Sequence, residues 1–116
     1  MSDEFSLTAR VSIDQTPISG VRNAASSEWS YFQAPEEHVI NKEAAVVNWE
    51  HDCTEERYDM VWDNWAEIVP GTGLKLPRRL AIRVHGCSKH GPLSGGAWAR
   101  LTVSGVIVKY TRFEVS

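Results

Sequence analysis

The chain has 116 residues, a length typical of one domain with a modest hydrophobic core, and we expect residues 1–116 to form a single domain. Hydrophobic residues make up 42% of the chain and charged residues 23%, a balance that excludes overall disorder. The formal net charge of −3 excludes a global basic field of the kind that holds nucleic acid. No apolar run approaches the roughly 20 residues of a membrane-spanning helix.

The first third of the chain predicts two strands. Residues 5–14 alternate between apolar and polar side chains without a break, which is the period of a half-buried strand. Residues 15–23 are rich in turn formers and predict a loop. Residues 28–33 predict a short strand that ends before Pro35, because proline cannot donate to a strand ladder.

The spacing of the apolar residues changes near residue 53. Residues 44–53 alternate and predict a third strand. Residues 55–69 instead place apolar side chains at helical spacing, with Asp52 or Thr54 available as a cap and Pro70 as a stop. The residues that follow this spacing are Tyr58, Val61, Trp62, Trp65, Ile68 and Val69. We therefore predict a helix over residues 55–69 whose buried stripe contains Trp62 and Trp65.

The remainder of the chain returns to strand periodicity. Residues 76–87, 97–104 and 106–115 predict strands, with Gly105 marking a bulge or bend. The expected fold is mainly β, an antiparallel β-sandwich or rolled sheet of about six strands with one helix at about residues 55–69. The helix is expected to cover an edge or an open end.

The cysteines bear on cellular location. The N-terminal stretch lacks the basic and apolar regions of an export signal. We therefore expect a cytoplasmic protein in which Cys53 and Cys87 are free thiols.

A metal site is one hypothesis for the histidines and cysteines. His51 and Cys53 lie two residues apart on one strand, His85 and Cys87 on another, and His90 follows. Imidazole and thiolate together suit zinc or copper. However, His51 and Cys53 lie on the expected core face, whereas His85 and Cys87 lie opposite the apolar face of their strand. The simpler interpretation is a buried thiol at Cys53 and a solvated His90, so no cofactor is predicted.

A polar surface is the second hypothesis. If the last two long strands form a hairpin, His85 lies opposite Trp98 and Arg83 lies opposite Arg100, all facing away from the apolar side. Two arginines directly opposite each other repel and destabilise a sheet. A ligand, a partner or an internal carboxylate would have to neutralise them. Trp98 adds a flat apolar platform beside these hydrogen-bond donors.

These features favour a non-enzymatic module that binds a carbohydrate or a small anionic ligand through Arg83, His85, Trp98 and Arg100. The alternative is a protein-interaction or assembly component, such as a phage, virion or toxin-neutralising part, that uses the same face and could form a homo-oligomer. The His/Cys metal site is the third hypothesis. Catalysis has the least support, since the sequence contains no Gly-x-Ser-x-Gly elbow and no recognisable acid–base couple.

Overall fold

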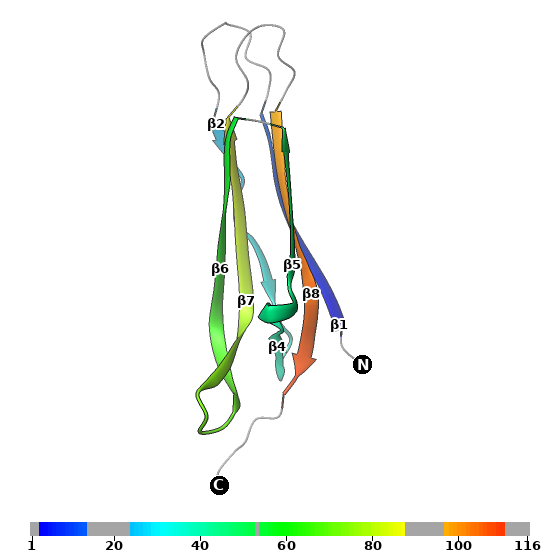
Figure 1. The fold of residues 1–116 in the computed structure, drawn as a ribbon, viewed down its shortest axis with the longest axis vertical. Helices are drawn as coiled ribbons and strands as arrows, with labels where there is room; N and C mark the ends of the chain where they lie inside the picture. The colour runs from blue at the N-terminus through cyan, green and yellow to red at the C-terminus, as the bar shows by residue number, and fades with distance from the viewer. Residues whose placement is uncertain (1–2, 14–23, 53, 88–96, 111–116) are drawn as a thin grey trace, which may run out of the picture.

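The computed structural model describes residues 3–13, 24–52, 54–87 and 97–110. These form an elongated, mainly β structure (Figure 1). Its elements are β1 (Asp3–Ile13), β2 (Ala24–Ser26), β3 (Ser30–Gln33), β4 (His38–Ile40), a 3-10 turn η1 (Lys42–Ala44), β5 (Val46–Asp52), β6 (Thr54–Val69), β7 (Leu74–Cys87) and β8 (Ala97–Lys109). The prediction of a mainly β antiparallel fold is confirmed, with eight strands in the described residues rather than about six.

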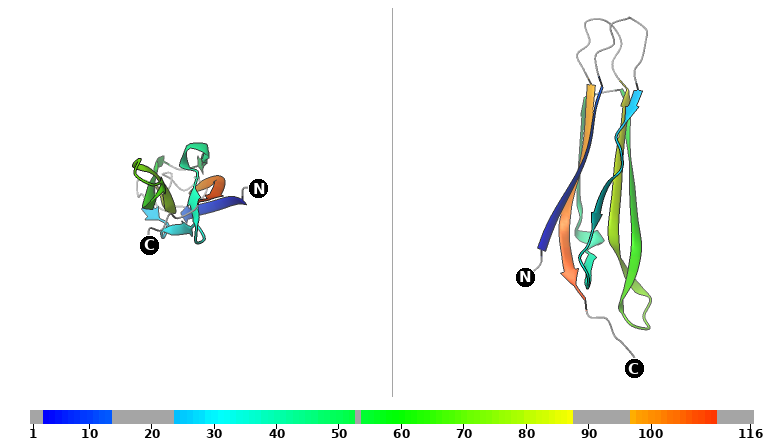
Figure 2. Two further views of the ribbon diagram at one scale, coloured as in Figure 1. Left: turned by 90° about the horizontal axis from the view of Figure 1, so that it is seen from below. Right: turned by 180° about the vertical axis from the view of Figure 1, so that it is seen from behind.

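The strands form two antiparallel sheets (Figure 2). In the first sheet, β8 is central: β1 pairs with one of its edges, and β5 and β4 pair with different parts of the other. In the second sheet, β7 is central: β6 pairs with one edge, and β2 and β3 pair with the other. β7 and β8 therefore belong to different sheets although they follow each other in the chain.

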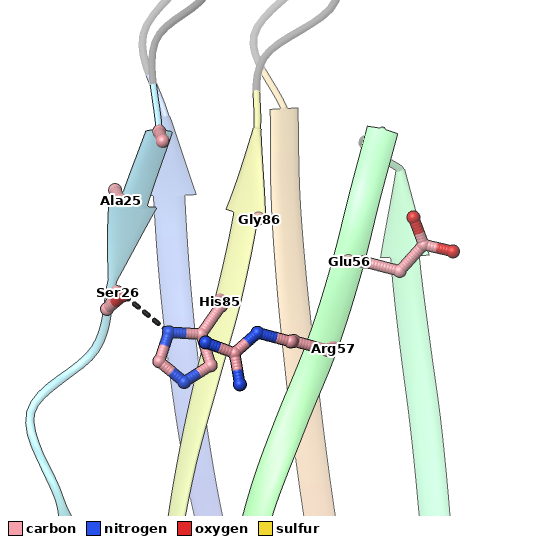
Figure 3. A pocket seen from close by; sticks show the side chains of 7 residues that line it. Ala25, Ser26, Glu56, Arg57, His85 and Gly86 are labelled. Carbon is pink, nitrogen blue, oxygen red and sulfur yellow. Dashed lines mark hydrogen bonds between the residues drawn. The ribbon is translucent and has the colours of Figure 1, made fainter.

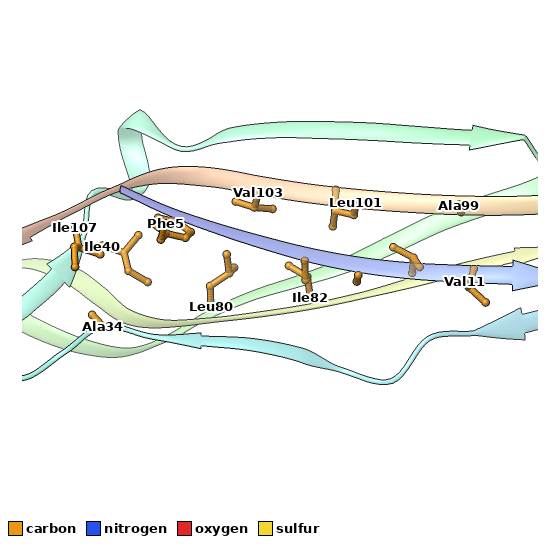
Figure 4. Close-up of a cluster of buried hydrophobic side chains, with 12 residues drawn as sticks. Phe5, Val11, Ala34, Ile40, Leu80, Ile82, Ala99, Leu101, Val103 and Ile107 are labelled. Carbon is orange, nitrogen blue, oxygen red and sulfur yellow. The ribbon is translucent and has the colours of Figure 1, made fainter. Parts of the chain in front are cut away.

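The core lies between the two central strands. The inward side chains of β7 and β8 alternate with outward ones, as the sequence predicts, and are completely buried (Figure 4). They are Leu80, Ile82 and Val84 on β7 and Ala99, Leu101 and Val103 on β8. Burying a side chain of this kind stabilises the fold by about 1.5–3 kcal/mol. From β1, Phe5, Ala9 and Val11 join the same cluster, so the predicted inward face of the first strand is confirmed for these residues.

Gly105 lies inside β8 and does not divide it into two strands. The register of β8 with β1 continues through Gly105, so the predicted bulge is wrong. A Cβ atom at this position would lie 3.1 Å from Cε1 of Phe5, whose ring also stacks on Phe32 with a centroid separation of 4.5 Å. The glycine therefore makes room for the Phe5 ring. Residues 111–115 of the predicted last strand lie outside the described residues, as does the predicted loop at 15–23.

The predicted helix at residues 55–69 is wrong, because this segment is the long strand β6. It pairs with β7 and alternates its side chains across the sheet; the cross-strand pairs include Tyr58–Val84, Met60–Ile82 and Trp62–Leu80. Trp62 packs on the core, whereas Trp65 is 47% exposed instead of sharing a buried stripe with it. Apolar residues lie on both faces of β6, and this imitates helical spacing. Valine, tyrosine, tryptophan and isoleucine favour strands, and long-range pairing with β7 selects the extended form.

Among the described residues, no helix has the length and hydrophobicity needed to cross a membrane.

Candidate functional site

The four predicted binding residues lie on two different sheets. Arg83 and His85 come from β7, and Trp98 and Arg100 come from β8. The predicted hairpin between these strands is wrong, because β7 and β8 belong to different sheets and do not pair with each other. They pack through their inward side chains instead. Arg83 therefore does not lie opposite Arg100, nor His85 opposite Trp98. The structure brings these residues together as two separate pairs with the core between them.

On the first sheet, Arg100 does face another arginine, but the partner is Arg10 of β1. On its other side Arg100 lies opposite Glu50 of β5, and its Nη2 donates to Glu50 Oε1 over 2.8 Å. The guanidinium carbon also lies 5.9 Å from the centroid of the Trp98 ring. An internal carboxylate thus offsets the like charges here, which was one of the explanations that the sequence left open.

On the second sheet, Asp59 of β6 is the centre of a polar network. Its Oδ2 accepts hydrogen bonds from Arg83 Nη2 over 2.8 Å, Arg83 Nε over 3.2 Å and His85 Nε2 over 2.8 Å. Its Oδ1 lies 3.4 Å from Nη1 of Arg57. The hydrogen bond from His85 and then those from Arg83 lower the pKa of Asp59 to about 2. Asp59 is therefore a carboxylate at neutral pH.

The ionised Asp59 determines the tautomer of His85. A carboxylate can only accept hydrogen bonds, so Nε2 of His85 carries a proton and donates it. In the neutral imidazole, Nδ1 is then an acceptor, and it lies within hydrogen-bond distance of Oγ of Ser26 on β2. When the imidazole is neutral, the Ser26 hydroxyl is therefore the donor to His85 Nδ1. The His85 side chain is only 12% exposed, and Ser26 lies directly opposite it in the β2–β7 register.

A surface pocket of about 480 Å³ opens beside this network (Figure 3). Figure 3 shows the side chains of Ser26, His85 and Arg57, which come from three neighbouring strands. The full lining consists of Ala24, Ala25, Ser26, Glu56, Arg57, His85 and Gly86. The volume falls within the range of small-molecule sites in proteins.

Charge in the pocket comes mainly from Arg57 and Glu56. The Arg57 side chain is 67% exposed, and its contact with Asp59 is long for a charged hydrogen bond. Oε1 of Glu56 lies 3.4 Å from Nε2 of His51. Arg57 therefore offers an exposed guanidinium at the pocket.

The sequence did not identify Ser26, Arg57 or Asp59 as site residues. Arg57 and Asp59 share a strand face through their spacing of two, but the helical interpretation of residues 55–69 concealed that signal. Ser26 lies in a three-residue strand that sequence periodicity cannot detect.

The described residues include only some of the candidate metal ligands. Cys53 and His90 lie outside the described residues. His51 and His85 belong to different sheets and contact Glu56 and Asp59, respectively. Within the part of the chain that the structure describes, no three histidine, cysteine, aspartate or glutamate side chains are grouped to hold a metal ion.

Comparison of the chain with known proteins gave no matching family model, no similar curated protein and no similar solved structure. The function of the protein is therefore inferred below from the residues of this chain alone.

Proposed function

We propose that the protein is a binding module for a small anionic ligand, seated in the pocket formed by Ser26, Arg57 and His85. The observation that carries the proposal is the exposed Arg57 guanidinium beside two further hydrogen-bonding side chains. Of the four residues predicted from the sequence, the proposed pocket contains His85, while Arg83 contacts Asp59 next to it. Trp98 and Arg100 lie on the other sheet and are not part of the proposed pocket.

The hydrogen bonds of Asp59 explain why Arg57 can bind a ligand. Arg83 and His85 both donate to Oδ2 at short distance, so this carboxylate is well neutralised without Arg57. A guanidinium carries five N–H donors, of which the 3.4 Å contact engages one. A carboxylate or phosphate group can accept two of them side by side.

The pocket walls limit the size of the ligand. Ala24, Ala25 and Gly86 supply little side-chain bulk, so the space beside the polar groups suits a small molecule or one acidic sugar ring.

A titration followed by NMR tests the proposal with four probes: inorganic phosphate, acetate, glucuronate and glucose. Phosphate, acetate and glucuronate should shift the amide signals of Ser26, Arg57 and Gly86. Glucose, which lacks the charge, should not. Arg57→Ala should weaken phosphate binding about 10- to 100-fold, the effect of losing a charged hydrogen bond.

The matched control is Arg10→Ala, which removes the same charge from the first sheet. It should leave phosphate binding unchanged. Equal binding by wild type and Arg57→Ala would refute the pocket, and equal shifts with glucose and glucuronate would favour carbohydrate recognition without charge.

A second candidate function is assembly with another copy of this chain through the edge of β6. This strand has 16 residues and pairs only with β7 among the described strands. Val61, Trp65 and Val69 on it are between 44% and 47% exposed. A long unpaired edge with apolar side chains is a template for another strand.

Sedimentation velocity should therefore show a dimer for wild type and for Ser6→Lys on β1, but a monomer for Val61→Lys. A monomeric wild type would refute assembly through this edge.

A further inference from the structure

We infer that Ser26 is a nucleophile and that the pocket cleaves short carboxylic esters through an acyl–Ser26 intermediate. Three side chains carry the inference: Ser26 Oγ lies within hydrogen-bond distance of His85 Nδ1, and His85 Nε2 is hydrogen-bonded to Asp59. A hydroxyl bonded to a base, with the base oriented by a third group, is the arrangement that activates a serine. The inference rests on the proposed pocket, because the same cavity must admit the ester.

The order of the two contacts gives the neutral His85 ring the right tautomer. Asp59 accepts the hydrogen bond from Nε2–H, so the nitrogen facing Ser26 is the basic one. Here Nδ1 is the base and Nε2 is the nitrogen that is held. Asp59 then faces the imidazolium that forms when His85 accepts the serine proton, and it stabilises that charge.

Neighbouring groups hold Asp59 in place. Two nitrogens of Arg83 contact the same Oδ2 that accepts from His85. The Arg83 guanidinium in turn lies over the Trp29 ring, with its carbon 4.5 Å from the centroid. Asp59 and Arg83 are therefore positioning residues, whereas Ser26 and His85 would touch the reacting atoms.

The acylation step follows from these positions. Ser26 Oγ forms a bond to the ester carbonyl carbon, its proton passes to His85 Nδ1, and the carbonyl electron pair moves to oxygen. Arg57, which lines the same pocket, supplies positive charge for this oxyanion. The C–O bond to the alcohol then breaks, and the departing alkoxide takes the proton from His85 Nδ1.

Deacylation reverses the roles with water. His85 Nδ1 accepts a proton from a water molecule that attacks the acyl carbon, and it returns a proton to Ser26 Oγ as the acid leaves. The acid releases its remaining proton to water and becomes a carboxylate, the kind of anion for which Arg57 is suited. The small residues at the pocket wall fit a short acyl chain.

Covalent labelling with a fluorophosphonate tests the inference, because the reagent phosphonylates activated serines and releases fluoride. Intact-mass analysis should show one adduct per wild-type chain, and peptide mapping should place it on Ser26. Ser26→Ala should abolish the adduct, whereas Ser6→Ala on the first sheet should retain it. His85→Gln should slow labelling at least 100-fold, the usual contribution of a general base.

A second assay does not depend on the His85 variant. p-Nitrophenyl acetate should give a burst of one p-nitrophenolate per chain in wild type and in Ser6→Ala, but none in Ser26→Ala. Ser26 is exposed, so its replacement by alanine should leave the far-UV circular dichroism unchanged.

Failure of this inference is distinguishable from failure of the binding pocket. Phosphate shifts at Arg57 without an adduct on Ser26 would overturn the nucleophile and leave anion binding intact. An adduct on Ser26 without phosphate shifts would support the nucleophile and remove the anion-binding proposal. An adduct that persists in Ser26→Ala would overturn the nucleophile.

Discussion

His85 donates its Nε2 proton to Asp59 over 2.8 Å, from adjacent strands of one sheet. This bond connects the fold to the candidate site, because it holds the imidazole ring and leaves Nδ1 for Ser26. It exists only because residues 54–69 are a strand: the β6–β7 register places Asp59 beside Arg83 and His85.

Asp59 should make the protein sensitive to acid. Its pKa of about 2 lies below the ordinary value of 3.8, so the folded state favours the ionised form. The resulting stabilisation is fully present above about pH 4 and is lost as the pH falls through about 2. Urea unfolding of Asp59→Asn should show lower stability at pH 7 and a flatter decline between pH 4 and pH 2. Glu28→Gln, an exposed carboxylate change, should retain the wild-type profile, and an equally steep decline in Asp59→Asn would contradict the assignment.

Two tryptophans of β6 should contribute unequally to stability. Trp62 packs on the core, so Trp62→Ala should cost about 3 kcal/mol. Trp65 is half exposed, and Nζ of Lys42 lies over its ring, 5.4 Å from the centroid, so Trp65→Ala should cost about 1 kcal/mol. Urea unfolding of the two variants measures the difference. Equal losses would indicate the shared buried stripe of a helix.

Removing Arg100 should change stability little. Arg100 and Glu50 are each 40% exposed, and exposed ion pairs contribute at most about 1 kcal/mol. Arg100→Ala also relieves the repulsion from Arg10 across the ladder. We therefore expect an unfolding free energy within about 1 kcal/mol of wild type and unchanged phosphate binding. Loss of phosphate binding in this variant would indicate that the anion binds on the first sheet, beside Arg100.

The sequence predicted three of the long strands well for a physical reason. β1, β7 and β8 each place apolar side chains on the core face and mainly polar ones on the other, so their alternation is visible around Phe5, Leu80 and Leu101 without any knowledge of the fold. β6 carries apolar residues on both faces, and the same rule gave a helix. β3 lies within the predicted strand at residues 28–33. β2 and β4 have three residues each, too few to show a period.

The candidate site was predictable only in part. Placing Arg83 and His85 on one face of a strand was correct, and both meet Asp59. Their partners depend on strand order, which is set by contacts between distant segments. The hairpin prediction joined consecutive strands, whereas β7 pairs with β6 and β8 pairs with β1.

The most direct test of the account is the protonation of the His85 ring, read from long-range ¹H–¹⁵N NMR correlations of ¹⁵N-labelled protein at neutral pH. We expect the neutral form of the ring to carry its proton on Nε2 in wild type and to be a mixture of tautomers in Asp59→Asn. We expect the Nδ1 signal to change when phosphate is added to wild type but not to Arg57→Ala. A neutral ring with its proton on Nδ1 in the free wild-type protein would contradict donation from His85 Nε2 to Asp59, and with it the proposed role of Nδ1 as the base that activates Ser26.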